Sequence, residues 1–214
     1  MNTEIEYVIK LREKFENSLN RLVQDLGNLK IGKNGQYPYG WRKAAKGRTV
    51  WRLVEELISQ NLEKNYEKYD LTNMNPSVSE VSVYDFSCTV KGFDEEIFVN
   101  IKGSNKDVRT NKDDISKAEK LLEFYGENKN KKLFVATFLM EFLDSMEISL
   151  ERCILMPIAW LPDIYINPSN NGNLQSSKYK DIEASIKRTN ADFLIEFQKA
   201  NAIALQKRRT KIKK

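Results

Sequence analysis

The chain has 214 residues, of which 41% are hydrophobic, so we expect a single domain with a sizeable core over residues 1–214. Its net charge is +5 and it contains no histidine, which excludes Ser-His-Asp triads, Cys-His nucleophiles and nearly all familiar zinc sites. Any hydrolytic chemistry must therefore use carboxylates, lysines and hard metal ions.

Nothing in the sequence indicates a membrane-spanning or secretory segment. No apolar run reaches the roughly 18 residues that a bilayer-spanning helix needs. The first ten residues carry acids and lack the apolar core of a signal peptide, so we expect a cytoplasmic protein. Cys88 and Cys153 both lie in apolar runs, and we expect buried free thiols rather than a disulfide framework.

The N-terminal part predicts two helices separated by an arm. Apolar residues recur at helical spacing over 4–26, and Gly27 stands where such a helix would end. Residues 28–47 hold four glycines and Pro38, which indicates a loop or an arm. A second helix is expected over 48–65, where apolar residues return every three or four positions.

The period then changes from about four to two, which indicates strands. Residues 80–91 and 95–102 are rich in β-branched and aromatic residues, and the Gly-containing link between them predicts a β-hairpin. The other expected elements are a loop over 70–77, a helix over 113–125, strands over 132–142 and 152–159, a loop over 167–178, and a helix over 190–207 capped by Thr189 or Asn190. This order predicts an α/β (α+β) fold with a central mixed β-sheet flanked by helices.

Two basic segments point to a polyanionic partner. The tail Lys207–Lys214 carries six cations and no acid, and without it the net charge would be −1. Such a tail is equally well explained as a solubilising end. The stretch from Lys30 to Arg52 also has no acid and interleaves aromatic residues, so here nucleic acid is favoured over a solvated loop. Its cations are Lys30, Lys33, Arg42, Lys43, Lys46, Arg48 and Arg52.

The expected hairpin carries a candidate active site. Side chains alternate along a strand, so Asn100 and Lys102 project from one face about 7 Å apart, and Asp85 on the preceding strand completes a triangle. Asp85 and Asn100 would supply oxygen ligands to Mg²⁺, and Lys102 would hold the attacking water and stabilise a pentacovalent phosphate. The plain alternative is an amphipathic hairpin with a polar outer face, because this spacing alone is common.

The triangle resembles the Asp…(Asp/Glu)-x-Lys signature of the restriction-endonuclease-like nuclease superfamily. Over about 48–209 the chain is similar to small type II restriction endonucleases that cut A/T-rich palindromes to blunt ends. The similarity rests on RTVWRLVEELI, VNIKGSN, LFVATFL, YINPSNNGNLQ and a closing helix with basic borders. It implies a restriction-endonuclease-like core, Mg²⁺-dependent hydrolysis to 5′-phosphate ends, a homodimer on a palindromic duplex, and a cognate DNA methyltransferase.

The resemblance also implies further site residues and one departure. The superfamily draws a second acid from an early helix, where this chain offers Glu56, which is preferred, and Glu55. Asn100 stands where the family usually has an acid, so the residue is either a native neutral ligand or the mark of a silenced enzyme. The basic and polar residues that commonly follow the lysine strand correspond to Ser104, Asn105 and Lys106.

DNA recognition is expected mainly from the segment 167–178, because Asn and Gln can make paired contacts to adenine edges. The segment Lys33–Arg48 would wrap the duplex and contact phosphates, with groove contacts from Gln36, Tyr37 and Tyr39. The candidates within the segment 167–178 are Asn170, Asn171, Asn173 and Gln175.

Two other functions remain open. One is a nuclease of the same fold that recognises DNA structure in repair. The other is a non-catalytic DNA-binding protein on the nuclease scaffold, which Asn100 would suit. RNA is a formal alternative for the basic segments, but no RNA-binding motif with aromatics at fixed spacing is visible.

Overall fold

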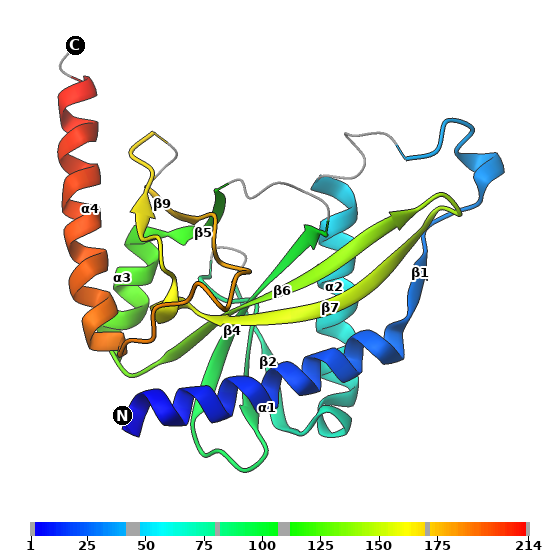
Figure 1. The fold of residues 1–214 in the computed structure, drawn as a ribbon, viewed down its shortest axis with the longest axis horizontal. Helices are drawn as coiled ribbons and strands as arrows, with labels where there is room; N and C mark the ends of the chain where they lie inside the picture. Colours follow the sequence, from blue (N-terminus) through cyan, green and yellow to red (C-terminus); the bar gives the residue numbers. More distant parts are fainter. Residues whose placement is uncertain (1–2, 42–47, 80–81, 107–111, 170–171, 213–214) are drawn as a thin grey trace.

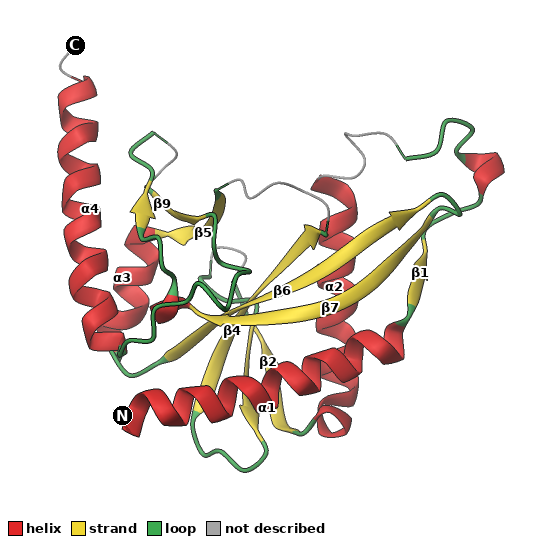
Figure 2. Ribbon diagram, in the orientation of Figure 1, coloured by secondary structure: helices red, strands yellow, loops and turns green. Residues whose placement is uncertain are grey.

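The computed structural model describes residues 3–41, 48–79, 82–106, 112–169 and 172–212 (Figures 1 and 2). Its α-helices are α1 (Thr3–Leu26), α2 (Arg48–Asn65), α3 (Ala118–Glu127) and α4 (Asn190–Ile212). The strands of the larger sheet are β1 (Asn28–Lys30), β2 (Leu71–Pro76), β3 (Phe86–Val90), β4 (Glu96–Asn105), β6 (Lys132–Leu143) and β7 (Glu147–Pro157). A smaller sheet contains β5 (Asp113–Lys117), β8 (Tyr165–Ile166) and β9 (Asn173–Ser176), and short 3-10 turns lie at Asn34–Gln36, Tyr66–Tyr69 and Ile158–Trp160.

The larger sheet is mixed, which confirms the expected fold class. Its strand order is β1-β7-β6-β4-β3-β2, with β4 and β6 parallel and the other neighbouring strands antiparallel. A parallel pair cannot be joined by a tight turn, and the chain between β4 and β6 includes the helix α3. In Figure 1, α3 and α4 lie with β5 and β9 on one side of the larger sheet, and on the other side β6 and β7 cross α2 in the view.

Both predicted N-terminal helices are confirmed. In α1 the buried positions recur every three or four residues, from Val8 through Phe15 to Leu22, so one face of the helix packs against the core. Gly27 adopts a positive φ of 58°, and its N–H donates to the Val23 carbonyl at 3.1 Å, which ends the helix. The second helix spans Arg48–Asn65, as its apolar period predicts.

Side chains of α1, in place of another strand, cover the outer edge of β7 beyond its short pairing with β1. The Asn20 amide donates to the Cys153 carbonyl at 3.0 Å and accepts from the Cys153 N–H at 2.9 Å. One turn earlier, the Glu16 carboxylate accepts from the Leu155 N–H at 2.8 Å. These bonds satisfy backbone groups that an uncovered sheet edge would leave open.

The polar segments of the sequence required the most correction. Residues 71–76 form β2 rather than a loop, because they pair with β3. Residues 113–117 form β5 rather than the start of a helix, because they pair with β9, and 173–176 within the predicted loop 167–178 are that strand. The predicted strand 152–159 begins earlier, at Glu147, and the last helix continues to Ile212. Thr189 caps that helix, with its hydroxyl accepting from the Asp192 N–H at 3.2 Å.

The two cysteines behave as predicted. Cys88 and Cys153 are buried free thiols, and burial raises the pKa of each. None of the helices in the described part of the chain combines the length and the apolar character needed to cross a membrane.

Candidate active site

Strand β4 carries the candidate site. Its buried side chains Ile97, Val99 and Ile101 are at most 3% exposed, as the alternation predicts, because they face the core. Asn100 and Lys102 point to the opposite face and are half-buried. The strand therefore places the amide and the ammonium group together on one side, as predicted from the sequence.

Asp85 lies one residue before β3, not within the strand as the sequence predicted. Its N–H donates to the Val99 carbonyl at 2.8 Å, and its carboxylate accepts from the Ile101 N–H at 2.5 Å. The pairing of β3 with β4 stops at Phe86 and Val99. Just beyond it, the Asp85 carboxylate accepts the backbone hydrogen bond of β4 that a further strand residue would otherwise accept. Asp85 is exposed as a residue, but the protein atoms around its carboxylate raise the pKa of the group, against the lowering effects of the Ile101 N–H and the Lys102 ammonium.

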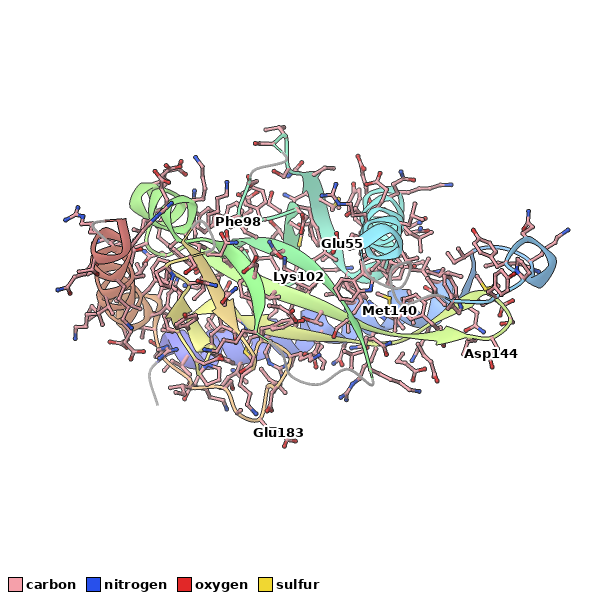
Figure 3. All side chains as sticks on the ribbon, turned by 90° about the horizontal axis from the view of Figure 1, so that it is seen from above. Glu55, Phe98, Lys102, Met140, Asp144 and Glu183 are labelled. Carbon is pink, nitrogen blue, oxygen red and sulfur yellow. The ribbon has the colours of Figure 1, made fainter. Side chains whose placement is uncertain are left out.

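Helix α2 brings a second carboxylate to the same edge. The helix approaches β4 closely at Gly103, where a Cβ atom would lie 2.7 Å from Met140 Cε and 3.5 Å from Trp51 Cγ. Glu55, one helical turn after Trp51, therefore lies over this edge and beside Lys102 (Figure 3). Burial raises the pKa of Glu55, and the Asp85 carboxylate raises it further, whereas Lys102 and the Gly103 N–H lower it.

Lys102 interacts electrostatically with both carboxylates but forms an ion pair with neither. Its positive charge lowers the pKa of Asp85 and of Glu55, which places it near both groups. All three side chains are within the described residues, and no ion pair within 4.0 Å joins them. The three groups therefore lie near one another without forming an ion pair.

The two carboxylates line a cleft of about 510 Å³, which Ile101 of β4 also lines. Asp85, Glu55 and Glu56 line it together with Arg52, which precedes Glu55 by three helical positions. Arg52 was part of the basic stretch in the sequence, but nothing in the sequence alone placed its side chain beside the carboxylates. A cleft with acids at one wall and a guanidinium nearby suits a phosphate that is bound through a cation.

The structure places Glu55, rather than the preferred Glu56, next to Lys102 and Asp85. Glu56 is exposed, and its carboxylate accepts a hydrogen bond from the Gln60 side chain at 2.7 Å. Successive helical residues point about 100° apart, so the rotation of α2 that aims Glu55 at Lys102 turns Glu56 toward solvent. Glu56 remains at the wall of the cleft, but Glu55 is the residue that interacts with Lys102 and Asp85.

Asn100 is anchored beside the Asp85 segment. Its amide nitrogen donates to the Val83 carbonyl at 3.2 Å, two residues before Asp85. Its amide oxygen is buried, and no described group donates a hydrogen bond to it. A buried oxygen without a hydrogen-bond partner costs free energy. A cation or a water molecule bound to the Asn100 oxygen would remove that cost.

The donor set fits a hard divalent cation. Among the described residues no cluster of three or more His, Cys, Asp and Glu side chains could hold a metal by itself. Mg²⁺, however, commonly binds to one or two carboxylates and fills its remaining positions with water and substrate oxygens. Asp85 and Glu55 provide such oxygen donors and no soft ligand, and the buried Asn100 amide oxygen is a further oxygen atom on the same strand.

The predicted DNA-contacting residues are distributed unevenly. Arg42, Lys43, Lys46, Asn170 and Asn171 lie outside the described residues, and Arg48 begins α2 without a described side chain. Lys33, Gln36 and Tyr37 are exposed on the segment after β1, as contacts to DNA would require. The Trp41 indole fastens that segment to the β6–β7 hairpin by donating to the Leu143 carbonyl at 2.7 Å.

Other predicted contacts are occupied within the protein. Ser104 is 4% exposed, and Lys106 pairs with Glu141 at 2.5 Å. The Gln175 amide donates to Asp114 at 2.7 Å and accepts from Asn167 at 3.3 Å, and the Asn173 side-chain oxygen is buried. Asn105, at the end of β4, is half-buried. Ser104 and Gln175 are therefore placed as internal hydrogen-bonding groups, which sequence alone could not indicate.

Comparison of the sequence with protein-family models and with curated proteins finds no significant match. The case for a function consequently rests on the geometry of the carboxylates, the lysine and the cleft.

Proposed function

We propose that the chain is a Mg²⁺-dependent endonuclease that hydrolyses phosphodiester bonds in double-stranded DNA. The observation that carries the proposal is the convergence of Asp85, Glu55 and Lys102 at the open edge of β4, with both carboxylates lining a cleft. Carboxylates whose pKa values are raised gain from a bound cation, because the cation favours their ionised form. Perturbed carboxylates in a cleft are typical of active sites.

Each side chain has a role in this reaction. Asp85 and Glu55 would hold Mg²⁺, with the Asn100 oxygen as a neutral donor nearby. The bound cation supplies charge neutralisation on the phosphate and acidifies water. Lys102 orients the attacking water on the side of the phosphate opposite the leaving oxygen, and its ammonium stabilises charge that develops on the phosphate. The products would be 5′-phosphate and 3′-hydroxyl ends.

The resemblance to type II restriction endonucleases refines the proposal. It suggests a homodimer that cuts a palindromic site and a partner methyltransferase that protects host DNA. The excess of cations supports a polyanionic substrate, since Arg52 lines the cleft and Lys207, Arg208 and Arg209 are exposed on α4. A cytoplasmic location agrees with this role.

A second function, non-catalytic DNA binding, is favoured by one observation. Asn100 contributes a neutral amide whose oxygen is buried, where a carboxylate would bind a dication more strongly. A protein with this residue could retain DNA affinity while losing turnover.

One experiment separates the two functions. Unmethylated phage DNA is incubated with Mg²⁺ in three separate reactions, which contain the unaltered protein, the Asn100→Asp variant or the Lys102→Ala variant. Thermal melting first shows that each of the three proteins is folded. Discrete fragments from the unaltered protein that disappear in Lys102→Ala support a nuclease with a native Asn100. Fragments from Asn100→Asp alone indicate a silenced enzyme. No fragments from any of the three would overturn the catalytic proposal and leave DNA binding.

A further inference from the structure

A second lysine is fixed to β4 two residues beyond Lys102. The Lys180 ammonium donates to the Ser104 hydroxyl at 2.8 Å, and Ser104 is nearly buried. Lys102 and Ser104 belong to the same side-chain face of β4 because they are two residues apart. The contact therefore brings a cation from a distant part of the chain to the face that carries the proposed catalytic lysine.

The segment that carries Lys180 is held in place on both sides. The neighbouring Tyr179 ring is 2% exposed, and its hydroxyl donates to the Asp113 carboxylate on β5 at 2.7 Å. On the other side, Asp181 accepts from the Ala184 N–H at 3.2 Å and so closes a turn. Lys180 is thus positioned by its neighbours as well as by its bond to Ser104, which limits the entropy lost when it binds a ligand.

The charge of Lys180 is left uncompensated. No carboxylate of the described residues lies within 4.0 Å of its ammonium, which donates to the neutral hydroxyl of Ser104. The adjacent acid, Asp181, is paired with Lys178 at 3.0 Å. An ammonium group has three N–H donors, so Ser104 leaves two of them for a ligand.

We propose that Lys180 binds a backbone phosphate of the DNA strand, next to the phosphate that is attacked beside Lys102. This inference rests on the proposed nuclease function. Positions i and i+2 of a strand are about 7 Å apart. Neighbouring phosphates of one DNA strand rise roughly 3.4 Å along the axis and, because the strand winds around that axis, are about 7 Å apart through space. Lys102 and the Lys180 ammonium held at Ser104 are therefore placed to contact neighbouring phosphates of one strand, and Lys serves as a point-charge phosphate ligand.

Binding to DNA tests the role of Lys180 independently of cleavage. Affinity for a fluorescein-labelled mixed-sequence duplex is measured by anisotropy over a range of salt concentrations, with Ca²⁺ in place of Mg²⁺. The unaltered protein is compared with Lys180→Gln, with the charge-preserving Lys180→Arg, and with the matched control Lys178→Gln. Lys178 is two residues away, and its charge is already paired with Asp181.

Lys180→Gln is expected to weaken binding by about tenfold at low salt and to reduce the log–log salt slope by about 1, because one phosphate contact is lost. Lys180→Arg should restore the slope, and Lys178→Gln should keep it. Equal curves for Lys180→Gln and Lys178→Gln would overturn the inference without affecting the nuclease proposal. Binding without cleavage in Mg²⁺ would overturn the nuclease proposal alone, and no binding by the unaltered protein would overturn both.

Discussion

Replacing Glu55 with Gln is the sharpest test of the candidate site, because Glu56 next to it is a matched control. Both substitutions remove one negative charge from the same turn of α2 and keep a side chain of the same size. Glu55 lies beside Lys102 and Asp85, whereas Glu56 is exposed and accepts a hydrogen bond from Gln60. Only the first substitution removes a charge that would contact the proposed cation.

The expected loss of cleavage rate in Glu55→Gln follows from the strength of the interaction between a carboxylate and a bound cation. Two unit charges about 4 Å apart interact by about 4 kcal/mol at an effective dielectric constant of about 20. Loss of an interaction of that size in the transition state slows a reaction by roughly a thousandfold. We therefore expect Glu55→Gln to slow single-turnover cleavage by about 10²–10³-fold and Glu56→Gln by no more than about threefold.

The assay is single-turnover cleavage of a labelled duplex at saturating enzyme and Mg²⁺, so that binding and product release do not limit the rate. Melting temperatures are measured for both variants. Because burial raises the pKa of Glu55, the neutral Gln should not destabilise the fold, and a slow variant is then not an unfolded one. Equal rates for Glu55→Gln and Glu56→Gln would refute the assignment of Glu55, and a slower Glu56→Gln would reverse it.

Two further predictions concern stability. In metal-free buffer Glu55→Gln should be more stable than the unaltered protein at neutral pH, and the difference should vanish as pH falls through the raised pKa, since the folded state then holds a protonated Glu55 at no charge penalty. Urea titrations across pH measure this, and a difference that grows in acid would contradict it. Thr137 is fully buried with no described partner for its hydroxyl, so Thr137→Val should raise the free energy of unfolding by about 1 kcal/mol. A loss of stability in calorimetry would mean that the hydroxyl has a partner, such as a bound water.

Elements with a clear internal period were predictable from the sequence. The helix over Arg48–Asn65 matches its expected position, and the predicted hairpin is present, although β3 begins at Phe86 and is shorter than the expected strand over 80–91. The strand β2 could not be found in this way. Its sequence LTNMNP has a loop-like composition, and it is extended because it pairs with β3.

The same distinction applies to the site. Alternation along one strand was sufficient to place Asn100 and Lys102 on a common face. The choice between Glu55 and Glu56 depended on how α2 is rotated, which is determined by the contact of Trp51 with Gly103, far along the chain. The approach of Lys180 to Ser104 joins residues 76 positions apart and leaves no local pattern in the sequence.

The cover that α1 provides for β7 has a consequence for how the protein is made. Asn20 binds the backbone of Cys153 across 133 residues, and until β7 has left the ribosome α1 lacks its most extensive packing partner. At synthesis rates of about 5–20 residues per second, that interval is on the order of 10 s. During that time the first helix must be shielded by chaperones or by transient contacts, so slow translation between residues 27 and 157 would favour aggregation of the nascent chain.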